Sequence, residues 1–220
     1  GLFIPVEWPK FDFMKHGNNV NYNELTFEIL SLFVGNDISK SDLSSIVEKS
    51  YSHAFTSQDY VTYQKLNHSI IVELFNGPTL AFKDFAMQLL IPLFDHFLGD
   101  ENRKVNLLVA TSGDTGSAAI NAVSKSKHVN IFCLFPKNRI SEFQRKQMST
   151  VGKENITLCE IDGTFDDCQN IVKSILGDQN FCKSNSVAAV NSINWARIAI
   201  QSVYYFYCLL YTSPSPRDKR

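Results

Sequence analysis

The stretch VNLLVATSGDTG, residues 105–116, is the clearest indication of fold class in this chain. Its first six residues are almost all apolar, as in a parallel β-strand that is covered on both faces. The next six are rich in glycine and hydroxyl side chains, and an apolar segment with helical spacing follows at residues 118–123. We therefore expect a strand, a tight loop and a helix in succession.

The same order of strand, turn and helix recurs on both sides of this stretch. Further strands are expected at residues 69–74, which read as buried, and at 130–135 and 156–161; helices are expected at 79–98, 141–150 and 166–176. Strands that alternate with helices at this spacing predict an α/β fold with a parallel sheet and right-handed crossovers. Residues 22–55 read as a helical lead-in of two or three short helices, with Ser41 or Asp42 as a cap.

Composition excludes several classes of protein. The chain has 220 residues, of which 44% are hydrophobic, enough for a packed core and too many for a disordered chain. Its formal net charge of -1 provides no excess positive field for nucleic acid. The longest mostly apolar stretch, residues 85–97, is too short and too polar to span a bilayer. We expect a soluble protein without nucleic-acid or membrane partners.

The five cysteines, at positions 133, 159, 168, 182 and 208, form no C-x-x-C pair and have no histidine at zinc-ligand spacing. Their number is odd, and no secretory signal precedes them. Reduced thiols, a cytoplasmic location and no metal site are the predictions. The ends are unusual: the chain begins GLFIP without Met, and residues 211–220 contain little to bury. We expect a front that has been clipped and a tail that is not native.

The loop at residues 111–116 is expected at the carboxyl end of a strand, where open α/β sheets bind ligands. Its glycines, among them Gly113, allow close approach of the backbone, and Ser112 and Thr115 add hydroxyl donors. A carboxylate or a phosphate would suit such a loop. The alternative is a plain turn in which Asp114 or Thr115 caps the helix.

Lys83 is an unusual lysine. On a helix that begins near Thr79 its neighbours in projection are apolar, so its ammonium lies in or beside the apolar stripe. Removal from water favours the neutral amine, which can attack a carbonyl and form a Schiff base. The alternative is a lysine in the first turn of the helix that reaches water, paired with Asp84 or another acid.

The segment NSINWAR, residues 191–197, opens another predicted helix. Asn191 or Ser192 can cap it, and Arg197 projects from an early turn. Amide, hydroxyl, guanidinium and helix N-terminus could therefore converge on a phosphate monoester. The alternative is a well-capped helix that carries an exposed arginine.

Together these segments resemble threonine synthases, pyridoxal-phosphate enzymes of the tryptophan-synthase-β fold group, also called fold type II. The similar segments are GPTLAFKDF at residues 77–85, ATSGDTG at 110–116, IDGTFDDC at 161–168 and NSINWAR at 191–197, together with GLFIP at the start of the chain. They occur in the family's order over residues 1–207. The resemblance implies an α/β fold of this type, truncated in this chain, with residues 1–62 as the family's N-terminal region, 63–209 as an incomplete cofactor domain and 210–220 as a non-native tail.

The resemblance also implies an activity, the conversion of O-phospho-L-homoserine and water to L-threonine and phosphate with pyridoxal 5'-phosphate as cofactor. Lys83 would form the Schiff base with the cofactor and then act as general base, and Asp114 would lie near the cofactor's phenolic oxygen. The residues that would hold the substrate's carboxylate are Ser112, Gly113 and Thr115, and those that would hold its phosphate are Asn191, Ser192 and Arg197.

Two features depart from the family. Asn76 stands where the family has histidine before Gly-Pro-Thr, and an amide does not titrate near neutral pH. The family's glycine-rich loop for the cofactor phosphate has no counterpart here, so this chain alone is expected to turn over little or nothing. Two alternatives remain open: a related phospholyase that produces a keto acid, and a non-catalytic phosphate- or nucleotide-binding α/β domain.

Overall fold

The computed structural model describes residues 4–16, 20–57, 59–99, 103–191 and 194–212. The chain divides into two compact units, which are described separately. One unit comprises Gly1–Leu89 together with Ile193–Arg220, and the other comprises Leu90–Ser192. Helix α3 (Lys83–Gly99) begins in the first unit and continues into the second.

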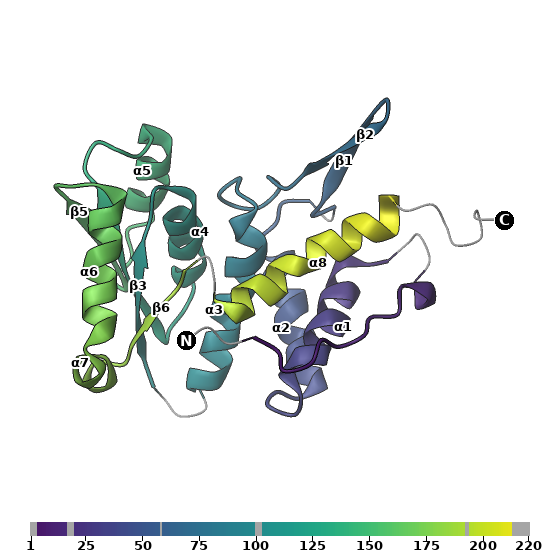
Figure 1. Cartoon of the computed structure of the whole chain (residues 1–220), viewed down its shortest axis with the longest axis horizontal. Helices are drawn as coiled ribbons and strands as arrows, with labels where there is room; N and C mark the ends of the chain where they lie inside the picture. Colours follow the sequence, from purple (N-terminus) through teal and green to yellow (C-terminus); the bar gives the residue numbers. More distant parts are fainter. Residues whose placement is uncertain (1–3, 17–19, 58, 100–102, 192–193, 213–220) are drawn as a thin grey trace. The chain divides into compact units, whose positions relative to one another are not determined.

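The second unit is built on a four-stranded sheet in the order β5-β4-β3-β6, and all its neighbouring strands are parallel (Figure 1). The strands are β3 (Val105–Ala110), β4 (Val129–Pro136), β5 (Ile156–Ile161) and β6 (Val187–Ala189). The helices between them are α4 (Asp114–Val123), α5 (Glu142–Ser149), α6 (Phe165–Gly177) and α7 (Gln179–Ser184). The expected α/β fold with a parallel sheet is confirmed.

Helices cover both faces of this sheet. On one face Leu108 and Leu134 pack against Cys168 and Val172 of α6. On the other face Cys133 lies against Met148 of α5, with 3.9 Å between the two sulfur atoms. Because successive strand residues point to opposite faces, the nearly continuous apolar run in β3 supplies side chains to both layers. This double coverage is the reason that the pattern identified the strand.

Three of the expected strands and their following helices are confirmed. The ends of the strands, of α5 and of α6 agree within one residue, whereas α4 begins at Asp114, four residues before the apolar segment that predicted it. Two elements of the second unit were not expected, α7 and β6. They contain six and three residues, too few to show a hydrophobic period.

The first unit contains a 3-10 turn (Phe13–Lys15), α1 (Tyr22–Val34), α2 (Lys40–Ser52), an antiparallel hairpin of β1 (Thr62–Leu66) and β2 (Ser69–Glu73), the start of α3, and α8 (Trp195–Thr212). The helical lead-in is confirmed. Its second helix is capped by Ser39, whose hydroxyl accepts the Asp42 N–H at 3.1 Å, and not by Ser41 or Asp42.

The strand expected at residues 69–74 is present, but the prediction that it is buried is wrong. It pairs only with β1 among the described strands, and Ile70 and Ile71 are 37% and 48% exposed. A short apolar run does not reveal which neighbour a strand will pair with. Its partner β1, with the sequence TYQKL, was missed because it carries no apolar run of its own.

An aromatic cluster holds the start of α3 in the first unit. The rings of Tyr22, Tyr51 and Phe55 surround Phe85, with centroids 5.6 Å from Tyr22 and 4.9 Å from Phe55. The Tyr51 hydroxyl also donates a hydrogen bond of 2.9 Å to the Phe85 carbonyl, and its burial raises the pKa of Tyr51 well above the ordinary value. The helix that begins at Lys83 is thereby attached to α2. No helix in the described part of the chain is long and apolar enough to cross a membrane.

Candidate active site

A clamped turn precedes Lys83. The Asp84 side chain is fully buried, and its carboxylate accepts the Thr79 N–H at 2.8 Å and the Thr79 hydroxyl at 2.7 Å. Residues 77–80 form a turn in which the Leu80 N–H donates to the Gly77 carbonyl at 3.1 Å. A Cβ at Gly77 would overlap the Asp84 side chain, which explains the glycine. The carboxylate of Asp84 therefore fixes the backbone that leads to Lys83.

Lys83 is the first residue of α3, so the helix starts four residues later than expected. Its side chain is half-buried, and its Nζ lies 4.5 Å from the centroid of the Phe82 ring. A cation above an aromatic face is stabilised by the negative charge of that face. Phe82 also lines a cleft of about 280 Å³, together with Val72, Leu74, Tyr204, Tyr205 and Cys208. The amine thus lies at a helix N-terminus beside an aromatic wall.

Asn76 has a structural role in the turn. Its Nδ2 lies 3.1 Å from the Tyr60 carbonyl, 3.2 Å from Thr62 Oγ1 and 3.3 Å from the Asp59 carbonyl. All three are oxygen atoms that can accept, so the amide acts here as a donor. The residue that replaces the family's histidine ties the clamped turn to the start of the hairpin.

The loop after β3 folds around one hydroxyl group. Thr111 is 2% exposed, and its Oγ1 accepts the N–H of Gly113 at 3.0 Å and of Gly116 at 2.9 Å. Gly113 has a φ of 143°, a conformation that glycine adopts without strain. Ser112 is exposed, and Thr115 is half-buried in the first turn of α4. The structure therefore brings Ser112, Gly113, Asp114 and Thr115 together at one helix N-terminus.

The cap of α4 differs from the expected alternative. Gly113 is the N-cap, without a side-chain capping hydrogen bond, and Asp114 is the first helical residue. Neither Asp114 nor Thr115 is the N-cap. Asp114 instead accepts a hydrogen bond of 2.5 Å from Gln144 Nε2. A carboxylate in the first turn interacts favourably with the positive end of the helix dipole.

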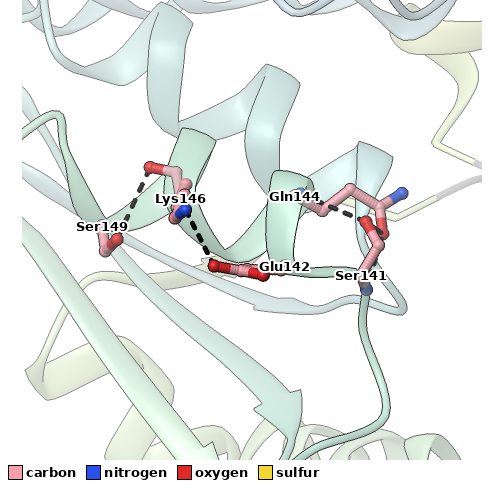
Figure 2. A network of polar contacts seen from close by, with 5 residues as sticks. All are labelled: Ser141, Glu142, Gln144, Lys146 and Ser149. Carbon is pink, nitrogen blue, oxygen red and sulfur yellow. Dashed lines mark hydrogen bonds and ion pairs between the residues drawn. The ribbon is translucent and has the colours of Figure 1, made fainter.

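Gln144 belongs to a capping box at the start of α5, which Figure 2 shows from nearby. Its Oε1 accepts the Ser141 hydroxyl at 2.9 Å and the Ser141 N–H at 3.3 Å. Sequence reasoning did not single out Asp84 as the residue that holds the turn before Lys83, nor Thr111 and Gln144 as the residues that hold the loop after β3. The spacing Ser141-x-x-Gln144 before a helix was a signal for the cap but not for its contact with Asp114.

The segment at residues 191–197 is organised differently from the expectation. Helix α8 begins at Trp195, and Asn194 Oδ1 accepts the Arg197 N–H at 3.2 Å, so Asn194 occupies the capping position. Asn191 is exposed, and Ser192 lies outside the described residues. Arg197 is only 2% exposed, which overturns the alternative of an exposed arginine. Burial lowers the pKa of its guanidinium, while nearby Tyr204 acts in the opposite direction.

The cysteines are poor candidates for a nucleophile, and the described side chains do not form a metal site. The cysteines are not joined in disulfides, and burial raises the pKa of the Cys133 thiol to about 12 and that of Cys168 in the same direction. A thiol that stays protonated is a poor nucleophile. In the part of the chain that the structure describes, no three side chains of histidine, cysteine, aspartate or glutamate gather as a metal site.

Comparisons with known proteins agree with these motifs. A family model described as "Threonine synthase N terminus" matches residues 1–51. The threonine synthase of Pseudomonas aeruginosa is 45% identical over 213 residues, which are 96% of this chain and 45% of the relative. The chain therefore spans less than half the length of that relative.

Solved structures give the same result. The structure of threonine synthase from Brucella melitensis with bound PLP has a TM-score of 0.89 and 40% identity, over 99% of this chain and 47% of that one. The yeast threonine synthase structure has a TM-score of 0.87 and 40% identity, over 98% of this chain and 45% of that one. In sequence and in fold, over nearly all of its length, the chain belongs to the threonine synthase family.

Proposed function

We propose that this chain is part of a threonine synthase that converts O-phospho-L-homoserine and water to L-threonine and phosphate with pyridoxal 5'-phosphate. The observation that carries the proposal is the position of Lys83, a half-buried amine at the start of α3, behind the turn clamped by Asp84. The Brucella relative was solved with PLP bound, which supports the same cofactor here.

The residues fit this cofactor. A primary amine held at a fixed place beside an aromatic ring suits covalent attachment of an aldehyde. When bound, the cofactor supplies an electron sink that stabilises negative charge at the substrate's carbon atoms. Lys83 Nζ, once exchanged for the substrate's amine, would take the proton from Cα and carry protons at Cβ and Cγ.

The start of α4 is proposed to bind the substrate's α-carboxylate. The hydroxyls of Ser112 and Thr115 are donors at a helix N-terminus, where the dipole favours an anion, and Gly113 without a side chain lets the backbone approach the ligand closely. Asp114, directly in this turn, is proposed to face the cofactor's phenolic oxygen. The Thr111 hydroxyl would keep the donors in place, because it holds both ends of the turn.

Arg197, Asn191 and Ser192 are proposed to bind the substrate's phosphate. A guanidinium presents several donors in a planar fork that matches phosphate oxygens. Because Arg197 is buried, its attraction for phosphate would be screened less than at the surface. The clamp would orient the leaving group and stabilise the charge that it gains as the bond to Cγ breaks.

A cytoplasmic location is also part of the proposal. It is supported by the five cysteines, none of them in a disulfide and two of them buried, and by the burial that keeps the Cys133 thiol protonated. Reduced thiols persist in a reducing compartment.

Product analysis tests the activity. The full-length protein is incubated with O-phospho-L-homoserine and pyridoxal phosphate, and threonine, phosphate and keto acid are measured. We expect equal amounts of threonine and phosphate. Lys83→Ala should reduce turnover by about a thousandfold or more, and Lys49→Ala, at an exposed lysine of α2, should not. Keto acid in place of threonine would identify a phospholyase instead.

A further inference from the structure

We infer that Gln144 is a positioning residue, which holds Asp114 and the adjoining turn in the arrangement that the reaction needs. The inference rests on the proposed function for the role of Asp114, and on the geometry of α5 and α4 for the contact itself. Gln144 lies 30 positions after Asp114 in the chain, and its Nε2 donates to Asp114 Oδ1 at 2.5 Å.

The orientation of the Gln144 amide follows from its partners. The Ser141 N–H can only donate, and it points to Oε1 of Gln144 at 3.3 Å, so the oxygen must face Ser141. The Ser141 hydroxyl adds a second hydrogen bond to the same oxygen at 2.9 Å. Figure 2 shows these contacts at the first turn of α5. The NH2 group is therefore the part that remains for the carboxylate.

The same side chain also constrains Gly113. A Cβ at Gly113 would overlap the terminal amide of Gln144, so this amide lies directly on the backbone of the turn. Gln144 thus contacts two consecutive residues to which the proposed function gives ligand-binding roles. Because the capping box already fixes Gln144, holding Asp114 costs little further side-chain entropy.

The choice of glutamine distinguishes this role from simple capping. Glutamate serves in a capping box as well as glutamine does, because its oxygen accepts the same two hydrogen bonds. At this position glutamate would offer no amide donor to Asp114 and would place a second negative charge beside it. If residue 144 were needed only as a cap, glutamate or glutamine would serve. To hold Asp114 it must be glutamine, because only the amide can donate.

Two substitutions separate the roles. Gln144→Glu retains the cap and removes the donor to Asp114, whereas Ser141→Ala removes the hydroxyl of the cap and leaves the donor. The readout is hydrogen exchange at the Gly113 and Gly116 amides, which donate to Thr111, in the full chain without cofactor. Thermal unfolding and the affinity for pyridoxal phosphate are measured alongside.

We expect Gln144→Glu to accelerate exchange at both amides by about tenfold and to weaken pyridoxal phosphate binding by a similar factor, since it loses a hydrogen bond to a charged group. Both single variants should lower the melting temperature by a few degrees, and only Gln144→Glu should accelerate exchange in the turn, whereas Ser141→Ala should leave it unchanged. The double variant Asp114→Asn with Gln144→Glu exchanges amide and carboxylate, and should restore protection of both amides.

Unchanged exchange in Gln144→Glu would overturn the inference, as would a double variant that exchanges as fast as Gln144→Glu alone. If Gln144→Glu unfolds, the double variant decides, because it retains both the cap and the contact with residue 114. Failure of the parent protein to bind pyridoxal phosphate would contradict the proposed function, and the exchange measurements would still decide the role of Gln144.

Discussion

Asp84 and Thr79 are joined by two hydrogen bonds, from the Thr79 N–H and the Thr79 hydroxyl to the two oxygens of a fully buried carboxylate. Removing one partner would leave a buried polar group without a hydrogen bond and destabilise the folded state, so this pair fixes the turn before Lys83. The clamp thereby determines where the Lys83 amine lies.

The clamp predicts the effect of three substitutions. Asp84→Ala should reduce the free energy of unfolding by about 2 kcal/mol or more, because it leaves the Thr79 N–H buried without its acceptor. Thr79→Val should cost about 1 kcal/mol, and Thr79→Ser, which keeps the hydroxyl, should cost less than half of that. Urea unfolding measures all three, and equal stability of the valine and serine variants would contradict the clamp.

The close contact between Gly77 and Asp84 predicts a further cost. Gly77→Ala should destabilise the protein by about 1–3 kcal/mol, because the new methyl group overlaps the Asp84 side chain. Gly177→Ala is the matched control, since a Cβ there meets nothing within 4 Å among the described residues. A Gly77→Ala protein as stable as the Gly177→Ala protein in thermal unfolding would show that the turn is not packed as described.

Asn76 should act through its NH2 group. Asn76→Asp should reduce the free energy of unfolding by about 1–2 kcal/mol more than Asn76→Ala, because a carboxylate would face the carbonyls of Tyr60 and Asp59 in place of a donor. Chemical denaturation near neutral pH compares the two variants. Similar stability of the two would indicate that the amide's hydrogen bonds contribute little.

The buried thiol of Cys133 predicts a pH dependence. Burial raises its pKa from the ordinary value of 9.0 to about 12, so the folded state holds the proton more tightly than the unfolded state. Its contribution to stability is complete below pH 9 and is lost as the pH rises toward 12. Cys133→Ala should therefore show a shallower decline in the free energy of unfolding over this range. An identical decline in both proteins would contradict the raised pKa.

Much of the fold could be predicted from sequence because β3 and β4 are largely buried on both faces, and because β3, β4 and β5 each end in a turn with glycine, proline or asparagine. The start of α3 could not, since the turn before Lys83 is held by the side chain of Asp84, a contact that no hydrophobic period records. The pairing of β2 with β1 could not be predicted either, because the polar sequence of β1 shows no hydrophobic pattern.

The sequence singled out candidate site residues, which stay a prediction, but not the residues that hold them in place. The sequence indicated Lys83, Arg197 and the loop with Asp114 because charged residues or glycines lie there beside apolar segments. It did not indicate Gln144 and Thr111, because their importance arises from contacts with backbone and side chains that folding brings close. Arg197 was expected to project, and its burial depends on the packing of α8.

Covalent attachment of the cofactor tests the proposed role of Lys83. The full-length protein is incubated with pyridoxal phosphate, reduced with borohydride and digested, and the modified peptide is identified by mass spectrometry. We predict one pyridoxyl group per chain, on Lys83, and none in Lys83→Ala. No adduct on Lys83, or adducts spread over exposed lysines such as Lys49 and Lys65, would contradict it.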